Sequence, residues 1–269
     1  GKMFLLLALV LVVVLGSASF FLLHLGSSGN STTAQQSGGT GGANAGANAA
    51  ATAAVQATAT AQSSLVAADS LASPIHNWTQ GNVSNIEFTF KGGAYHIRQN
   101  GQWLGYALMP AQQLPKNYTY TLTMQNVDYN KGDQNSLSFY CMIMNYQSYN
   151  NNKAQSFYAL RVNNGTNISY EFDKYDNRNT GANGNPWTQI FPDPNNSAGV
   201  GKGNGKEFRG PHQPNVYSVT EHNGNFTFSV NGVKIGTAKD TAFTGGALGM
   251  GVNQSGTEAA FSNLTLSGN

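Results

Sequence analysis

The stretch "NVYSVTEHNGNFTFSVNGVKIGTA", residues 215–238, decides the fold class of this chain. Apolar and polar residues alternate in three short runs, the pattern of strands that bury one face. Asn-Gly separates the runs twice, at 223–224 and at 231–232. Asn and Gly tolerate the positive φ angles of a type I′ turn, the commonest two-residue hairpin loop. The stretch therefore predicts two consecutive β-hairpins.

Similar runs fill the chain from about Ser73 to its end, and none of them shows the apolar period of a helix. Short strands joined by Asn/Gly turns are typical of a sandwich or a barrel. Roughly 195 residues are enough for one such core. We therefore predict one all-β domain over 73–269, with strands at 85–93, 94–99, 118–127, 136–144, 156–162, 167–172, 215–221, 225–230, 233–238, 247–253 and 259–266.

Two segments of this domain resemble a known group of proteins. "FTFKGGAYHI" (88–97) is similar to the opening of the concanavalin A-like lectin/glucanase group, and residues 215–266 are similar to its close. The group includes laminin-G-like and 3-keto-disaccharide-hydrolase-type jelly rolls, which occur as extracellular modules of bacterial single-span membrane proteins. The resemblance implies a concanavalin-like jelly-roll β-sandwich. The matched residues include no catalytic residue of the group.

Residues 1–25 are predicted to form a transmembrane helix. Residues 3–23 contain no charge and no proline, and about 20 apolar residues cross the ~30 Å hydrocarbon core as a helix. The alternative is a signal peptide cleaved at "GSAS", but the apolar run resumes after that site with "FFLLHL". Lys2 precedes the span and the next Lys or Arg is Lys91, which predicts a cytoplasmic N-terminus. We expect a single-pass protein of the cell membrane, with residues 3–25 in the bilayer and the C-terminal domain extracytoplasmic.

Residues 26–72 are predicted to be a low-complexity stalk. The segment consists mainly of Gly, Ser, Thr, Asn and Ala, and it has no aromatic residue and no Leu, Ile or Phe before Leu65. It cannot bury enough apolar surface to offset the entropy lost on ordering. Its Gly/Ser-rich part is typical of a flexible tether.

The charge and cysteine content exclude several functions. The formal net charge is +2, and no Lys/Arg cluster is longer than a pair, so the basic footprint of a nucleic-acid-binding protein is missing. Cys141 is the single cysteine, which excludes an intrachain disulfide and a CxxC motif. It lies in the apolar run "FYCMIM" (139–144), where we expect a buried thiol.

The stretch "YEFDKYD" (170–176) holds the candidate site residues. "NNGT" (163–166) predicts a two-residue hairpin loop at Asn164–Gly165, which would pair Ala159 with Tyr170. One face then carries the apolar residues Phe157, Ala159, Ile168, Tyr170 and Phe172, although Arg161 interrupts it near the turn. The other face carries Ser156, Tyr158, Leu160, Ser169, Glu171 and Asp173, and it points away from the core.

Three interpretations of this face remain open. Laminarinase- and lichenase-type glycosidases carry E-x-D-x-E, or E-x-D-x-x-E with a bulge, and "EFDKYD" resembles the bulged form. That resemblance implies Glu171 as nucleophile, Asp173 as orienting residue and Asp176 as acid. The third carboxylate is one methylene too short, however, and Lys174 would lower nearby carboxylate pKa values, the wrong direction for an acid. The other interpretations are ligand binding by Tyr158, Glu171 and Asp173, and an ordinary solvated face.

No cofactor is predicted. "DYNKGDQN" (128–135) offers Asp128, Asn130 and Asp133 as oxygen ligands for Ca²⁺, but it lacks the EF-hand spacing and polar residues are favoured in such loops anyway. The leading hypothesis is a membrane-anchored extracellular module that binds a ligand, expected to be a glycan, as the sensor part of a receptor. The alternatives are a glycoside hydrolase or related sugar-processing enzyme, and a structural or adhesive surface protein.

Overall fold

The computed structural model describes residues 65–110, 114–128, 138–164, 168–178, 184–193, 201–202, 207–210 and 212–268. These residues form two antiparallel sheets and no helix. The predicted all-β sandwich is therefore confirmed. Among the described residues no helix is long and apolar enough to cross a membrane. The predicted helix at 1–25 and the predicted stalk as far as residue 64 lie outside the described residues.

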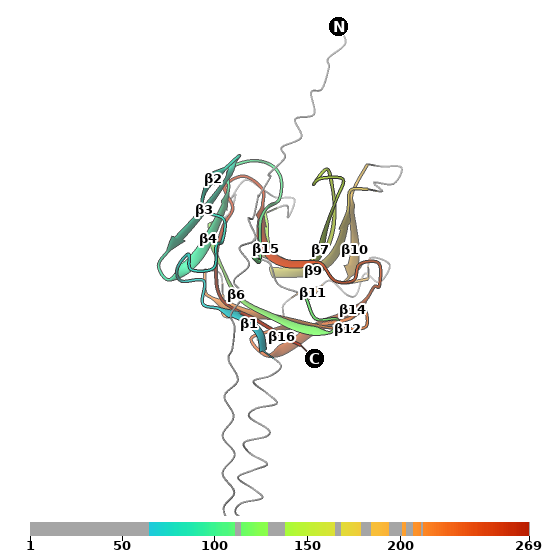
Figure 1. The fold of residues 1–269 in the computed structure, drawn as a ribbon. Coiled ribbons are helices and arrows are strands. Elements are labelled where there is room, and N and C mark those ends of the chain that lie inside the picture. Colours follow the sequence, from blue (N-terminus) through green and yellow to red (C-terminus); the bar gives the residue numbers. More distant parts are fainter. Residues whose placement is uncertain are drawn as a thin grey trace, which may run out of the picture. The chain divides into compact units, whose positions relative to one another are not determined.

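The two sheets are stacked as layers, with β6, β12 and β16 in one and β7, β9 and β15 in the other (Figure 1). The nine-stranded sheet has the order β14 (Val233–Lys239), β13 (Asn225–Val230), β12 (Asn215–His222), β6 (Tyr118–Asp128), β16 (Glu258–Gly268), β4 (Ala94–Gln99), β3 (Ile86–Lys91) and β2 (Gly81–Val83), and β1 (Leu65–Asp69) also pairs with β16. The seven-stranded sheet has the order β10 (Trp187–Phe191), β9 (Ile168–Asp176), β8 (Ala154–Asn164), β7 (Phe139–Tyr149), β15 (Ala247–Asn253) and β5 (Gly105–Leu108), and β11 (Gly201–Lys202) also pairs with β9.

Both predicted Asn-Gly hairpins are confirmed. His222 pairs with Asn225 and Val230 with Val233, so each loop contains two residues. The φ angles are 51° and 76° at 223–224 and 49° and 82° at 231–232. All four are positive, as a type I′ turn requires.

The core between the sheets is rich in tyrosine, whose hydroxyl groups need partners when buried. Tyr118 donates to Asn145 Oδ1 at 2.9 Å, Tyr120 donates to the Gly249 carbonyl at 3.1 Å, and Tyr140 and Tyr217 lie 3.1 Å apart at their hydroxyls. Each bond joins a strand of one sheet to a strand of the other. The core therefore fixes the alignment of the two sheets as well as burying apolar surface.

The folded unit begins earlier than predicted. Strand β1 pairs with β16, Leu71 is fully buried, and Asp69 accepts hydrogen bonds from the Leu71 N–H at 2.7 Å and from Trp78 Nε1 at 2.8 Å. Residues 65–72 therefore belong to the sandwich, and the predicted boundary at residue 73 is eight residues too late. Strand β1 can pair here because β4 covers β16 only at residues 258–261, which leaves the same edge of β16 available at residues 264–267.

The pairing of β8 with β9 differs from the predicted register. Leu160 pairs with Phe172, and Asn164 pairs with Ile168, so three residues rather than two separate the strands. The shift of three exchanges the two faces of β8. Tyr158, Leu160 and Val162 lie in the inter-sheet core, and Phe157 and Ala159 belong to a separate cluster on the other side of the sheet. Both faces of β8 are apolar, which is why alternation did not distinguish them.

Candidate functional site

The candidate site lies on the outer face of the seven-stranded sheet, the face turned away from the nine-stranded sheet. A second apolar cluster, separate from the inter-sheet core, covers this face. An outer sheet face is normally polar. A cluster of aromatic rings on this face therefore marks a candidate interaction site. We call six of its members the outer aromatic cluster: Tyr106, Phe139, Tyr146, Phe157, Tyr175 and Trp187.

Phe157 lies at the centre of the outer aromatic cluster. Its ring centroid is 4.7 Å from that of Tyr175 and 5.7 Å from that of Trp187, and it is 6.0 Å from Tyr146 and 6.5 Å from Tyr106. Phe157 is almost fully buried, whereas Tyr106, Tyr175 and Trp187 are half-buried. The outer aromatic cluster therefore consists of partly exposed rings packed around a buried central ring, that of Phe157.

Three charged side chains stand beside these rings, and we call them the charged trio: Arg161 on β8, and Glu171 and Asp173 on β9. Arg161 lies directly opposite Glu171 in the strand pairing. Its Nη2 atom is 3.3 Å from Glu171 Oε2, and its Nη1 atom donates to Asp173 Oδ2. The guanidinium carbon lies 4.3 Å from the centroid of the Phe139 ring and 5.4 Å from that of the Trp187 ring. The rings and both carboxylates therefore hold Arg161 in one orientation.

Burial differs across the charged trio. The side chain of Asp173 is 2% exposed, against 18% for Arg161 and 27% for Glu171. Burial and the neighbouring Glu171 charge raise the pKa of Asp173 to about 6, although Arg161 acts in the opposite direction. At neutral pH the trio carries one positive and two negative charges, hence a net charge of −1.

Two atoms of the charged trio have no hydrogen-bond partner. Asp173 Oδ1 and Arg161 Nε are both buried and unpartnered. Buried polar atoms in native proteins are nearly always hydrogen-bonded, so each exception calls for an explanation. One atom is an acceptor and the other is a donor, and a hydroxyl group can satisfy both kinds because it donates and accepts.

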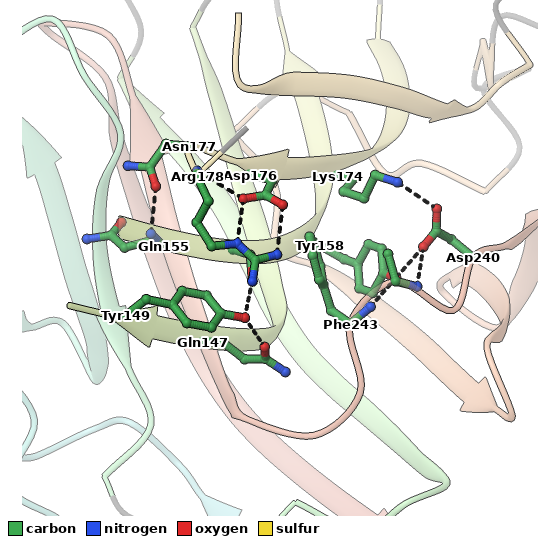
Figure 2. A network of polar contacts seen from close by, with 12 residues as sticks. Gln147, Tyr149, Gln155, Tyr158, Lys174, Asp176, Asn177, Arg178, Asp240 and Phe243 are labelled. Carbon is green, nitrogen blue, oxygen red and sulfur yellow. Dashed lines mark hydrogen bonds and ion pairs between the residues drawn. The ribbon is translucent and has the colours of Figure 1, made fainter. Parts of the chain in front are cut away.

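Tyr158, predicted to bind ligand beside Glu171, is part of the inter-sheet core instead. It is fully buried, and its hydroxyl donates to Asp240 Oδ1 at 2.5 Å and accepts from the Phe243 N–H at 3.0 Å. Lys174 Nζ lies 3.1 Å from Asp240 Oδ2. Figure 2 shows this group, which ties the segment after β14 to β8 and β9. The corrected register explains the change of face.

Asp176, the third carboxylate of the glycosidase-like pattern, does not join the other two. The β8–β9 pairing has no bulge between residues 168 and 176, so Asp176 points to the opposite face from Glu171 and Asp173. Its oxygens accept from Arg178 Nε at 2.9 Å and Nη2 at 2.8 Å (Figure 2). Tyr175 occupies the position that the unbulged pattern reserves for an acid.

The predicted calcium ligands are described only in part. Asp128 ends β6 and faces Glu258 of β16, whereas Asn130 and Asp133 lie outside the described residues. Within the described ranges, no group of three or more His, Cys, Asp or Glu side chains is placed to hold a metal ion. The predicted buried thiol is confirmed, since Cys141 is free and fully buried, and burial raises its pKa to about 12.

Sequence reasoning placed Glu171 and Asp173 on the correct face and missed the residues that surround them. Arg161 is a charged residue in a face that was otherwise predicted to be apolar. That exception was the available signal that Arg161 pairs with the carboxylates. Trp187 lies in β10, which was not predicted, and Tyr106 lies in β5, a four-residue strand without clear alternation.

No protein-family model and no curated protein matches the sequence. Solved structures do match its fold. The carbohydrate recognition domain of Emp46p aligns at a TM-score of 0.50 with 9% identity, over 77% of this chain and 97% of that one. The carbohydrate-binding module CBM66 of Bacillus subtilis (0.45, 15%, over 71% and 94%) and the β-glucanase of Bacillus licheniformis (0.48, 10%, over 76% and 98%) also align. At these identities the likeness concerns the fold alone, and the alignment with the Emp46p domain agrees with the predicted concanavalin A-like sandwich.

Proposed function

We propose that the chain is a glycan-binding module and that the outer face of the seven-stranded sheet is its binding surface. The observation that carries this proposal is the pair of unpartnered buried atoms, Asp173 Oδ1 and Arg161 Nε, beside the outer aromatic cluster. A ligand hydroxyl that reaches them would replace the hydrogen bonds that the protein leaves unmade.

The combination of groups on this face fits a sugar ring. A sugar has apolar C–H faces, which pack on aromatic rings, and hydroxyl groups around its edge. The half-buried rings of Tyr175 and Trp187 lie next to the charged trio, since Arg161 stacks on Trp187 at 5.4 Å. Apolar walls with a few fixed polar groups are the usual composition of a small-molecule site.

The charge of the site favours a neutral glycan. The charged trio lies beside the second apolar cluster, and its one arginine and two carboxylates sum to −1 at neutral pH. A carboxylate or sulfate group on the ligand would be repelled by Glu171, which is the more exposed of the two acids. Neutral hexose polymers avoid that repulsion.

The shared fold with a carbohydrate recognition domain supports the same proposal. We further propose that residues 1–25 anchor the chain in the cell membrane and that the segment after them holds the sandwich outside the cell. In such an arrangement, glycan binding at the surface would be the input of a receptor. The uncharged run at 3–23 behind Lys2 motivates this part of the proposal.

Glycoside hydrolysis is the alternative, motivated by two carboxylates on one face and by the raised pKa of Asp173, about 6. A retaining enzyme needs a nucleophile and an acid about 5–5.5 Å apart on either side of the scissile bond. Asp173 is engaged by Arg161, and Asp176 points away. Of the three carboxylates in the glycosidase-like pattern, this face therefore leaves one accessible, Glu171, where hydrolysis needs two.

A glycan array and a hydrolysis assay test the proposal together. The purified chain is applied to arrayed neutral and acidic glycans and is incubated with laminarin and lichenan while reducing ends are counted. We expect binding to neutral glycans and no new reducing ends. Turnover that Glu171→Gln abolishes would establish the enzyme instead, and the absence of both binding and turnover would favour a structural or adhesive role.

A further inference from the structure

Trp103 is the most exposed of the large apolar side chains in the part of the chain that the structure describes. Its exposed fraction is 81%, compared with 69% for Ile75 and 49% for Val233. Tryptophan is highly buried on average, so an indole left in water gives up a large part of its apolar stabilisation. Tryptophan combines an apolar ring with a polar N–H and is enriched at binding surfaces.

The loop that presents Trp103 is firmly anchored. Gln99, which is 3% exposed, accepts a hydrogen bond from the Gly101 N–H at 2.7 Å through its side chain and donates another to the Trp103 carbonyl. The Gln99 backbone is tied to residues 256 and 257 by two hydrogen bonds of 2.8 and 2.9 Å, and the Asn100 N–H donates to the Asn85 carbonyl at 2.7 Å. The backbone that carries the indole is therefore ordered before any ligand binds, which lowers the entropic cost of binding.

The loop that carries Trp103 leads directly into the far edge of the proposed binding surface. The next residue, Leu104, packs against the second apolar cluster, and β5 follows as the edge strand of the seven-stranded sheet. Between β5 and β9 lie β15, β7 and β8, so the two strands are about 19 Å apart at a spacing of ~4.8 Å. Tyr106 on β5 and Tyr146 on β7, whose hydroxyls lie 3.1 Å apart, extend the aromatic surface from β5 toward the middle of the sheet.

We propose that Trp103 is a second contact for the glycan and that the ligand is an oligosaccharide which crosses the sheet from the charged trio to β5. The inference rests on the proposed function and adds a length requirement to it. One sugar ring covers only a small part of ~19 Å, so a monosaccharide or disaccharide at the charged trio leaves Trp103 untouched. A longer chain can stack one of its rings on the indole.

The test measures the affinity of the purified full chain for laminaribiose and for laminarihexaose by isothermal titration calorimetry. One stacking contact is worth about fivefold in affinity, so we expect the hexaose to bind about fivefold more tightly than the biose. Trp103→Ala should remove that advantage and leave biose binding unchanged. Ile75→Ala, which truncates the next most exposed apolar side chain, is the matched control and should alter neither affinity.

Equal affinity of the wild type for the two oligosaccharides would overturn this inference and leave the proposed function standing. So would an equal loss of both affinities in Trp103→Ala, or no loss of either. Binding of neither oligosaccharide would contradict this inference, and a glycan array without binding as well would contradict the proposed function itself.

Discussion

Strand β9 contributes to one polar group on each side of its sheet, and the two groups differ in how completely they are paired. These are the Tyr158–Asp240–Lys174 group on the inner side and the charged trio on the outer side. On the inner side, Asp240 accepts from Tyr158, from the Ala242 N–H and from Lys174, so both of its oxygens have partners. On the outer side, Asp173 and Arg161 bind each other, yet Asp173 Oδ1 and Arg161 Nε are left without a partner.

This difference distinguishes a structural group of side chains on the inner side from the proposed binding site on the outer side. A fully paired network inside a protein adds rigidity, and the Tyr158–Asp240–Lys174 group ties the segment after β14 to β8 and β9. An incompletely paired network costs stability, and such costs are found where function requires them. The comparison therefore predicts that changes on the inner face alter folding without altering binding, and that changes on the outer face alter binding.

The largest effect is expected for Tyr158→Ala. The Tyr158 ring is fully buried and lies 5.4 Å from the Phe172 ring, 5.1 Å from Phe226 and 5.0 Å from Phe243. Removing a buried aromatic ring costs about 3–5 kcal/mol, so urea unfolding should show a loss of that size. Unchanged stability together with weaker glycan binding would contradict this prediction and support the ligand-binding role that the sequence predicts for Tyr158.

Asp173→Asn should change how stability depends on pH. The pKa of Asp173 in the folded protein is about 6 instead of the ordinary 3.8, so between these pH values the folded state binds more protons than the unfolded state. The unfolding free energy therefore decreases as pH rises through this window. One pKa unit corresponds to about 1.4 kcal/mol, so the total decrease is about 3 kcal/mol.

The measurement is urea unfolding of wild type and Asp173→Asn from pH 4 to pH 7. The wild type should lose stability relative to the variant over this range, because the variant lacks the titrating group. Subtracting the two curves removes the contributions of Asp69, Asp176, Asp240 and Glu258, whose pKa values are lowered and act in the opposite direction. Parallel curves would mean that Asp173 titrates normally.

A smaller effect is expected for Tyr158→Phe, which removes only the hydroxyl group. Asp240 Oδ1 and the Phe243 N–H each lose a partner, although Asp240 keeps Lys174 and the Ala242 N–H. A lost hydrogen bond to a charged group costs about 1.5–3 kcal/mol, and the remaining partners place this variant at the lower end. Thermal unfolding should show the loss, while titration with laminarihexaose should give the wild-type affinity.

The sequence predicted features that local chemistry determines. Asn-Gly at 223–224 and 231–232 specifies its turns whatever surrounds it, and the outward position of Glu171 and Asp173 follows from the apolar residues between them. The register of β8 against β9 depends on which apolar face of β8 meets the other sheet, and both of its faces are apolar. The role of Arg161 depended on that register.

Other parts of the site depend on packing between distant segments. Trp187 reaches the charged trio only because β10 pairs with β9, and β10 has no alternation that marks it as a strand. Asp173 is buried in the assembled sheet, where it bonds to Arg161 and Arg161 lies against two aromatic rings. Its raised pKa therefore cannot be predicted from the sequence "EFD" alone. The unpartnered atoms that define the site are a property of the assembled sheet.

The most direct test of the central claim is one pair of matched substitutions, Glu171→Gln and Glu87→Gln. Both glutamates lie opposite an arginine across a strand pair, Arg161 for Glu171 and Arg98 for Glu87, but Glu87 is on the nine-stranded sheet. Calorimetric titration with laminarihexaose should give at least a tenfold weaker affinity for Glu171→Gln, since a hydrogen bond to a charged group is lost, and no change for Glu87→Gln. Both variants should unfold within about 1 kcal/mol of wild type, because both glutamates are partly exposed and a partly exposed ion pair such as Arg161–Glu171 contributes little to stability. Wild-type affinity in Glu171→Gln, or an equal loss in both variants, would contradict the assignment of the binding surface to the outer face of the seven-stranded sheet.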